Sequence, residues 1–306
     1  MIIVDVGANH GDFALDIAKK NNQYKVIAIE PINSLVDIIK EDILKNSIKN
    51  IDVIPVAIDI EARIAKMNIA SHHDWGVSSL LSFSETKLSD EYWSTREDMY
   101  FDATQDVEVK PLSMILSEYN VGPENRVAFI KIDTQGLDLE VLLSAGHYIQ
   151  YIDAGMLEVS INTDLGLYLE EENDLTNVLA WLKENDFKPY KLKPNDHASN
   201  EFNLYFCKNS LNSDEIEKTL SLRGIDLYDG KFYWHFPSPK LLSIEEEYQN
   251  LIQENNNNRS KLANLNKVLR DVDPTLQTID DLDEYFKNRK AVSLFFKIMK
   301  ILKIIK

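Results

Sequence analysis

A turn rich in small residues follows the first apolar run of the chain and has the composition of a ligand-binding loop. Gly7 and Gly11 lie between the strand-like run Ile2–Val6 and a helix-like run at residues 13–18. Glycine has no Cβ, so the chain can turn sharply and a ligand can lie against its backbone. In open parallel sheets, ligands bind at the carboxyl ends of strands, where such turns lie. We therefore expect a ligand here; an ordinary strand-to-helix connection is the alternative.

An acidic residue at the end of the second strand-like run supports that expectation. Glu30 lies 19 residues after Gly11, and Pro31 ends the run. In doubly wound folds an acid at this place binds ribose hydroxyls. A dinucleotide pyrophosphate would favour a helix start without acids, whereas Asp5 and Asp12 flank this turn. The acids favour the cationic amino end of S-adenosylmethionine.

A third polar position ends a mainly apolar run further along the chain. Asp133 directly follows residues 127–132. A carboxylate is costly to bury without a partner, so an acid here indicates a site and not only a core strand. The alternative is a structural acid that caps the next helix, which we expect to begin near residues 136–137.

The elements that would position these residues alternate between strands and helices. The predicted strands are residues 2–6, 26–29, 53–56, 129–132, 154–159, 187–191 and 202–206, and the predicted helices are residues 35–44, 112–119, 137–143 and 175–182. This alternation predicts an α/β fold, a mostly parallel sheet with helices on both faces. The stretch 60–126 breaks the rhythm, and we interpret it as an insertion that forms a lid over one end of the sheet.

The composition excludes several other classes of protein. The chain has 306 residues, of which 44 % are hydrophobic, enough for a sizeable core. A single cysteine, Cys207, excludes a disulfide framework. The net charge of −17 argues against a nucleic-acid partner. We see no signal peptide and no apolar run near the ~20 residues that span a membrane, so we expect a cytoplasmic protein.

Several motifs together resemble the FkbM-type S-adenosylmethionine-dependent methyltransferases. They are VDVGANHGDFAL, AIEPINSLVD, SSLLSF, FIKIDTQGLDLEVLLSAG and GMLEVSIN, all within residues 1–207. The resemblance implies a class I methyltransferase (Rossmann-like) fold with seven strands, the last one antiparallel. It also implies O-methylation of a hydroxyl, usually on a sugar or a natural product. His10 stands where the family usually has an apolar residue, and Gln135 stands where it usually has Glu.

Carried over by position, the resemblance implies a cofactor site and the roles of its residues. The residues that match cofactor-binding positions are Asp5, Gly7, Asn9, Gly11, Glu30, Pro31, Asp133 and Gln135. Among them, Asp133 and Gln135 match the polar tip of the fourth strand, which faces cofactor and substrate. Glu158 matches the acid at the end of the fifth strand.

Methyl transfer to a hydroxyl requires in-line alignment and benefits from a general base. The catalytic candidates are Asp133, Glu158, His72 and His73. The histidine pair has the more suitable ordinary pKa and lies in the expected lid, although a solvated loop would also explain it. No metal is indicated, but a divalent ion on Asp133, Glu158 and Asn162 stays open.

Four aromatic residues of the expected lid could stack on the rings of a carbohydrate or small-molecule acceptor. They are Trp75, Tyr92, Trp93 and Tyr100. Packing of the insertion's own core is an equal alternative. Two functions of other classes also stay open: a catalytically inactive binding module with the same fold, and a nucleotide-dependent oxidoreductase. The lack of a G-x-G-x-x-G motif argues against the latter.

The sequence beyond the predicted methyltransferase domain (1–210) changes in character. After a linker (211–243), residues 244–306 form an expected helical appendage in which apolar residues at alternating steps of four and three give a heptad seam. An asparagine run at 255–258 makes either a polar layer or a turn between two helices. Residues 287–306 contain seven Lys or Arg and no acid. As a helix they would have an apolar face and a lysine face, which suits peripheral membrane contact or helical self-association.

Overall fold

The computed structural model describes residues 1–71, 75–85, 100–161, 167–169, 174–194, 201–222, 232–233, 236–237 and 253. The chain divides into two units, Met1–Ser238 and Pro239–Lys306, and the description below concerns the first. The expected residues His72, His73, Tyr92, Trp93 and Asn162 lie outside the described residues, as do the heptad segment apart from Gln253 and the basic tail.

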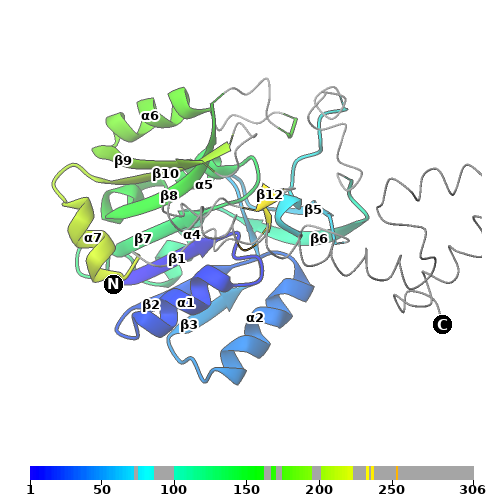
Figure 1. The fold of residues 1–306 in the computed structure, drawn as a ribbon, viewed down its shortest axis with the longest axis horizontal. Coiled ribbons are helices and arrows are strands. Elements are labelled where there is room, and N and C mark those ends of the chain that lie inside the picture. Colours follow the sequence, from blue (N-terminus) through cyan, green and yellow to red (C-terminus); the bar gives the residue numbers. More distant parts are fainter. Residues whose placement is uncertain are drawn as a thin grey trace, which may run out of the picture. The chain divides into compact units, whose positions relative to one another are not determined.

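A seven-stranded sheet forms the centre of the first unit (Figure 1). Its order is β3-β2-β1-β7-β8-β10-β9. The strands are β1 (Ile2–Val6), β2 (Lys25–Ile29), β3 (Ile51–Ile54), β7 (Val127–Ile132), β8 (Ala154–Ser160), β9 (Phe187–Pro194) and β10 (Glu201–Lys208). The last strand of the sheet along the chain, β10, lies between β8 and β9 and runs antiparallel to both. The strands β3, β2, β1, β7 and β8 pair in parallel.

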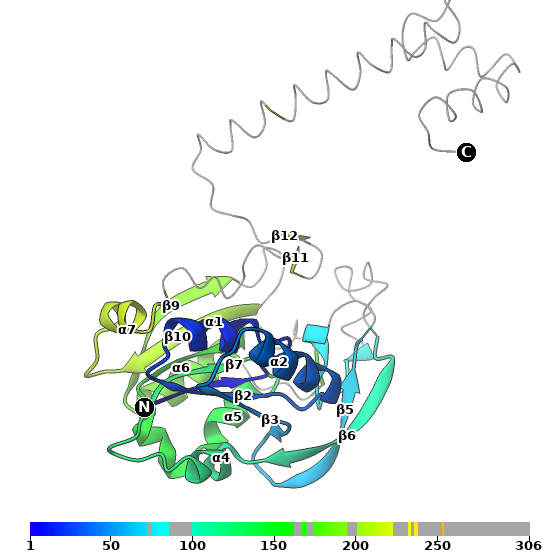
Figure 2. The same ribbon diagram turned by 90° about the horizontal axis from the view of Figure 1, so that it is seen from below.

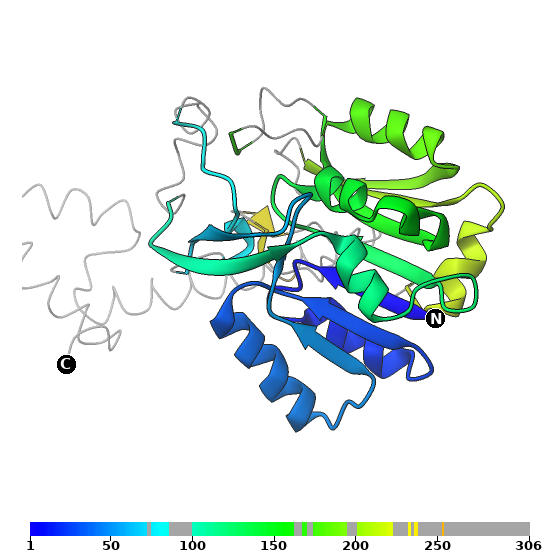
Figure 3. The same ribbon diagram turned by 180° about the vertical axis from the view of Figure 1, so that it is seen from behind.

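Helices cover both faces of this sheet because its central strands are apolar on both sides. One face packs on α1 (Asp12–Lys20), α2 (Asn33–Lys45) and α7 (Ser213–Thr219). The other packs on α4 (Leu112–Glu118), α5 (Asp138–Ser144) and α6 (Leu175–Glu184), and Figure 3 shows the sheet from behind. Strand β1 divides its side chains accordingly: Ile2 and Val4 face the α4 side, whereas Ile3 faces the α1 side. The alternation of an extended strand places one core on each face.

A second, three-stranded sheet accounts for much of the stretch that we interpreted as an insertion. It consists of β4 (Ala57–Ile58), β6 (Ala103–Lys110) and β5 (Arg63–Ile69), in that order. Figures 1 and 2 show it at the end of the main sheet where the parallel strands have their carboxyl ends. Helix α4 also lies within 60–126, but Leu112, Ile115 and Leu116 belong to the central core. This helix is therefore a layer of the main fold.

The remaining elements are short. They are the 3₁₀ helices η1 (Trp75–Val77) and η3 (Gly146–Tyr151) and the antiparallel pair β11 (Phe232–Tyr233) and β12 (Phe236–Pro237). Strand β3 begins and ends two residues before the predicted strand at 53–56, and it ends directly before Pro55, which has no backbone N–H to donate. Where residues are described, no helix is both long and apolar enough to cross a bilayer.

The observed strand order confirms the expected fold class. A mostly parallel seven-stranded sheet, helices on both faces and one antiparallel strand next to the edge make this a class I methyltransferase fold, which is Rossmann-like in its first half.

Candidate active site

The turn after β1 is held close to the neighbouring strand β7. Gly7 has a φ of +75°, and a Cβ added to it would lie 1.9 Å from the backbone oxygen of Asp133. Gly11 has a φ of +81°, and its added Cβ would meet the side chain of Ile39 in α2 at 2.9 Å. Both positions therefore need glycine for contacts within the chain itself, whatever ligand they also approach.

Glu30 lies at the end of β2 and is joined to the turn after β1. Its Oε2 accepts a hydrogen bond from the backbone N–H of Asn9 at 2.8 Å, and its Oε1 accepts one from Ile32 N–H at 2.9 Å. Burial raises the pKa of Glu30 to about 7, although both N–H donors act in the opposite direction. Close by, the buried side-chain oxygen of Asn9 has no hydrogen-bond partner among the described residues. Two polar acceptors thus gather at the tips of β1 and β2.

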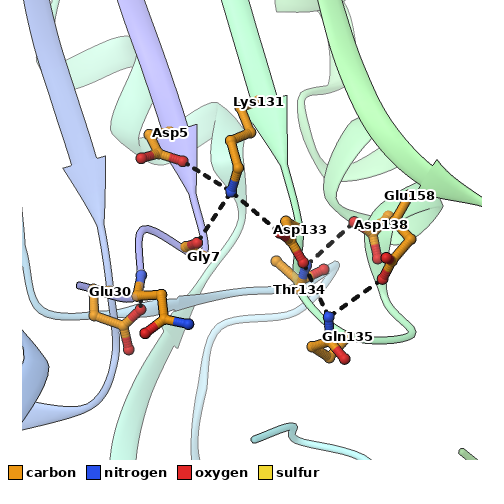
Figure 4. Close-up of polar contacts among 10 residues, drawn as sticks. Asp5, Gly7, Glu30, Lys131, Asp133, Thr134, Gln135, Asp138 and Glu158 are labelled. Carbon is orange, nitrogen blue, oxygen red and sulfur yellow. Dashed lines mark hydrogen bonds and ion pairs between the residues drawn. The ribbon is translucent and has the colours of Figure 1, made fainter. Parts of the chain in front are cut away.

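Lys131 connects the first strand to the fourth. It is the register partner of Asp5 on the adjacent parallel strand. Its Nζ lies 3.3 Å from Asp5 Oδ1 and 3.4 Å from Asp133 Oδ2, and it donates to Gly7 O at 3.3 Å (Figure 4). Burial alone would lower the pKa of Lys131, but the two carboxylates raise it above its ordinary value. Burial also raises the pKa of Asp5 to about 6, against the pull of Lys131.

Gln135 joins the carboxylates at the ends of β7 and β8. Its Nε2 donates to Asp133 Oδ1 at 3.0 Å and to Glu158 Oε2 at 3.3 Å (Figure 4). The next helix does not use Asp133 as a cap: α5 begins after Leu137 without a side-chain cap. Asp138 accepts from Thr134 N–H at 3.2 Å instead, and burial raises the pKa of Asp138. The capping alternative for Asp133 is therefore wrong.

The structure brings most of the predicted site residues together. The ends of β1, β2, β7 and β8 carry Asp5, Gly7, Asn9, Glu30, Asp133, Gln135 and Glu158. Pro31 takes part through its backbone, because Gln105 Nε2 donates to its carbonyl oxygen at 2.9 Å. Gln105 Oε1 also accepts from Asn33 N–H at 3.2 Å. The three-stranded sheet thereby braces the turn that follows Glu30.

Two predicted groups do not join this cluster. Gly11 packs on Ile39, as described above. Of the lid aromatics that the structure describes, Trp75 packs partly buried against the core of the three-stranded sheet, which favours the packing alternative for this residue, and Tyr100 is exposed.

Sequence reasoning missed Lys131, Gln105 and Tyr168. Lys131 left a signal: a lysine inside an otherwise apolar central strand is buried on either face, so it requires a carboxylate partner. Gln105 left no such signal in the sequence, because a glutamine is common in an amphipathic strand. Tyr168 lies in a short stretch without a periodic pattern.

Metal ligation has little support in the described part of the chain. It contains no group of three or more His, Cys, Asp or Glu side chains arranged to hold a metal ion. Asp133 and Glu158 are instead bridged by an amide donor.

Comparison with known proteins identifies the family. Fold and site together define a class I methyltransferase-type domain with acidic residues at four strand ends. Residues 5–189 match the sequence profile described as "Methyltransferase FkbM domain", which covers more than half of the chain. The chain belongs to this FkbM methyltransferase family, as its motifs indicated.

The individual proteins that resemble this chain have low sequence identity to it. Methyltransferase sdnD from Sordaria araneosa is 29 % identical over 153 residues, which are 46 % of this chain and 58 % of that protein. The chain thus spans little more than half the length of this relative. Among solved structures, a SAM-dependent methyltransferase from Aquifex aeolicus is 14 % identical (TM-score 0.33) and matches 67 % of this chain and 81 % of its own. A magnesium protoporphyrin IX methyltransferase from Synechocystis PCC 6803 with bound SAM is 9 % identical (TM-score 0.38), with 68 % and 70 % covered.

Proposed function

We propose that this chain is an S-adenosylmethionine-dependent O-methyltransferase that acts on a hydroxyl of a sugar, a glycan or a glycosylated natural product. One observation carries the proposal: within an FkbM domain, the Glu30 carboxylate is held at the end of β2 by the backbone of the turn after β1. This is the place where doubly wound folds bind the ribose of an adenine-containing cofactor.

The residues present fit S-adenosylmethionine. Glu30 supplies a carboxylate for the ribose hydroxyls, and Asn9 Oδ1 supplies a buried acceptor beside it. In the cluster of Figure 4 the single lysine, Lys131, contacts Asp5 and Asp133, and the further acids Glu30, Asp138 and Glu158 leave carboxylates in excess. An acidic site of this kind attracts a cationic ligand and repels a pyrophosphate. The charge pattern supports the methyltransferase over the nucleotide-dependent oxidoreductase.

Methyl transfer to a hydroxyl requires no covalent bond between the protein and the substrate. When bound, S-adenosylmethionine would supply an electrophilic methyl group on its sulfonium for transfer to the acceptor oxygen. The proton of the hydroxyl passes to a carboxylate of the site. Asp133 and Glu158 lie side by side at the ends of adjacent strands and are the base candidates of the described cluster. A general base contributes on the order of 10²–10⁴ to the rate.

Cofactor binding is the first test. Calorimetry should show binding of S-adenosylmethionine and S-adenosylhomocysteine, and none of NAD. Binding of NAD alone would replace the proposal with the oxidoreductase.

Turnover is the second test and needs an acceptor. Surface glycans from cells with and without the protein should differ by one methyl group in mass spectrometry, and tritiated S-adenosylmethionine should label the same fraction in vitro. Asp133→Asn or Glu158→Gln should then lower kcat strongly without changing cofactor affinity. Cofactor binding without transfer to any fraction would favour the inactive binding module.

A further inference from the structure

Gln135 occupies the space between two carboxylates of the site. Its Nε2 donates to Asp133 Oδ1 at 3.0 Å and to Glu158 Oε2 at 3.3 Å. A primary amide nitrogen has two hydrogens, and an ionised carboxylate can only accept. One side chain therefore supplies one donor to each of the two carboxylates, as Figure 4 shows.

The opposite end of the amide contacts a buried tyrosine hydroxyl. Gln135 Oε1 lies 2.9 Å from the hydroxyl of Tyr168, which also lies 2.9 Å from Val77 O. If the amide were reversed, its oxygen would face both carboxylates and repel them. The buried Tyr168 hydroxyl has one proton for two acceptors, Gln135 Oε1 and Val77 O, so the amide is oriented by the two carboxylates, to which only Nε2 can donate.

The backbone of Gln135 is held in an unusual conformation. Its φ is +58°, in the left-handed region that is uncommon for residues other than glycine. Its carbonyl oxygen accepts from Ser79 Oγ at 2.7 Å. Ser79 and Tyr168, neither of which lies in the main sheet, thus hold the backbone and the side chain of Gln135. A costly backbone conformation that several contacts maintain is typical of functional sites.

We propose that Gln135 is a positioning residue that donates one hydrogen bond to each of the carboxylates of Asp133 and Glu158 and holds them side by side, with an uncharged amide between the two acids. The role of the two carboxylates in methyl transfer rests on the proposed function. The bridge that Gln135 forms between them, called the clamp below, does not. A glutamine in this place bridges the two carboxylates without adding a charge, which preserves the acidic character of the site.

Several ionisable groups lie near the pair in the described part of the chain. Lys131 faces Asp133 from β7, and Asp5 lies behind it on β1. Asp138 on α5 contacts Thr134 N–H, and Tyr168 contacts the amide. None of these groups changes when Gln135 alone is replaced, so a change in the titration of the pair reports the loss of the amide.

The test is a titration of the carboxyl carbons by NMR, which needs no methyl acceptor. Protein labelled with ¹³C at the Asp and Glu carboxyl carbons is titrated as wild type and as Gln135→Met, which keeps the length of the side chain and removes the amide. Asp133→Asn and Glu158→Gln assign the two signals. In Gln135→Met the midpoint of the later-titrating signal should rise by about one pH unit or more, because two like charges lose their shared donor.

Two further variants keep the test decisive. Gln150→Met, on the exposed η3, should leave both midpoints unchanged. Tyr168→Phe keeps both amide donors of Gln135 and removes the hydroxyl that contacts Gln135 Oε1. It should therefore shift the midpoints in the same direction by a smaller amount. It replaces Gln135→Met if that variant does not fold. Midpoints in both site variants equal to those of the wild type would overturn the proposal.

Metal binding provides an independent check. Calorimetry with Mn²⁺ alone should show no binding to the wild type that depends on Asp133 and Glu158. Such binding would mean that a cation displaces the amide, and would overturn the proposal. Calorimetry with S-adenosylmethionine on the same samples tests the proposed function separately from the clamp. Shifted midpoints without cofactor binding would reject the proposed function and retain the clamp.

Discussion

The backbone N–H of Asn9 donates a 2.8 Å hydrogen bond to Glu30 Oε2 and so joins the turn after β1 to the end of β2. This contact stabilises the carboxylate, whereas burial favours its neutral form and raises the pKa of Glu30 to about 7. The charge of Glu30, the proposed ribose-binding group, therefore changes near neutral pH, which leads to the first two predictions.

Affinity for S-adenosylmethionine should depend on pH through Glu30. Ribose hydroxyls donate to the ionised form, so affinity should fall as pH falls below about 7, approaching about tenfold per pH unit. In calorimetry, Glu30→Gln should bind about 1.5–3 kcal/mol more weakly than the wild type above that pH and show a flat profile. A flat wild-type profile between about pH 6 and pH 8 would contradict this role.

Without cofactor, the same burial should make stability fall with rising pH. The folded-state pKa of Glu30 lies above its ordinary value of 4.5, at about 7, and that of Asp5 lies above 3.8, at about 6. Their contribution is fully present below the ordinary values and is lost as pH rises through the folded values. Urea unfolding across this window should show a shallower decline in Glu30→Gln than in the wild type. An equal decline would assign the effect to other groups.

Lys131→Met should destabilise the fold by about 3–5 kcal/mol, because it leaves Asp5 buried without a cation. The exposed Lys66, paired with Asp106 at 3.5 Å, is a matched control, and Lys66→Met should change stability by less than about 1 kcal/mol. The double variant Asp5→Asn with Lys131→Met should recover part of the loss in urea unfolding. Equal midpoints for Lys131→Met and Lys66→Met would show that the buried pair contributes nothing.

Alanine substitutions at three glycines separate the cost of a positive φ from the cost of a steric contact made by the added Cβ. At Gly122 a Cβ meets nothing and no positive φ is required; at Gly146 φ is +55° but the space is open; at Gly7 both constraints apply. Alanine should be near neutral at Gly122, cost about 1–2 kcal/mol at Gly146, and cost clearly more at Gly7. Thermal unfolding of the three variants gives the order, and a Gly7→Ala midpoint as high as that of Gly146→Ala would mean that β1 and β7 can separate at little cost.

For the basic tail we propose contact with anionic membranes. Its lysines would each contribute about 1 kcal/mol near an anionic surface, whereas the acidic remainder of the chain would be repelled. Sedimentation with anionic liposomes at low salt should capture the full chain. Replacement of Lys297, Lys300 and Lys303 by Glu should abolish capture, while the same change at the exposed Lys19, Lys40 and Lys45 should not. A wild-type chain that stays in the supernatant would leave self-association as the role of the tail.

Several parts of this molecule follow from sequence alone because they depend on neighbours along the chain. The run Ile2–Val6, the turn at Gly7 and the helix after it form a local unit, in which a nearly continuous apolar run gives way to the 3.6-residue apolar period of a helix. The same local logic places Glu30 and Asp133 after apolar strands, at the carboxyl ends where parallel sheets bind ligands. Helix α4 shows the limit of that logic, because its pattern predicts a helix but not which sheet it covers.

The sequence determined which side chains end the strands; the tertiary structure decided which of them touch. Asp5 and Lys131 are far apart in the chain and meet only because β1 and β7 pair in one register. Gln105 reaches the turn after Glu30 from a different sheet, and Tyr168 reaches Gln135 from another segment. The repeat of apolar residues along a strand specifies which face is buried, but it contains no information about the register or the neighbour of that strand. Pairing between distant segments is settled by the packing of the whole core.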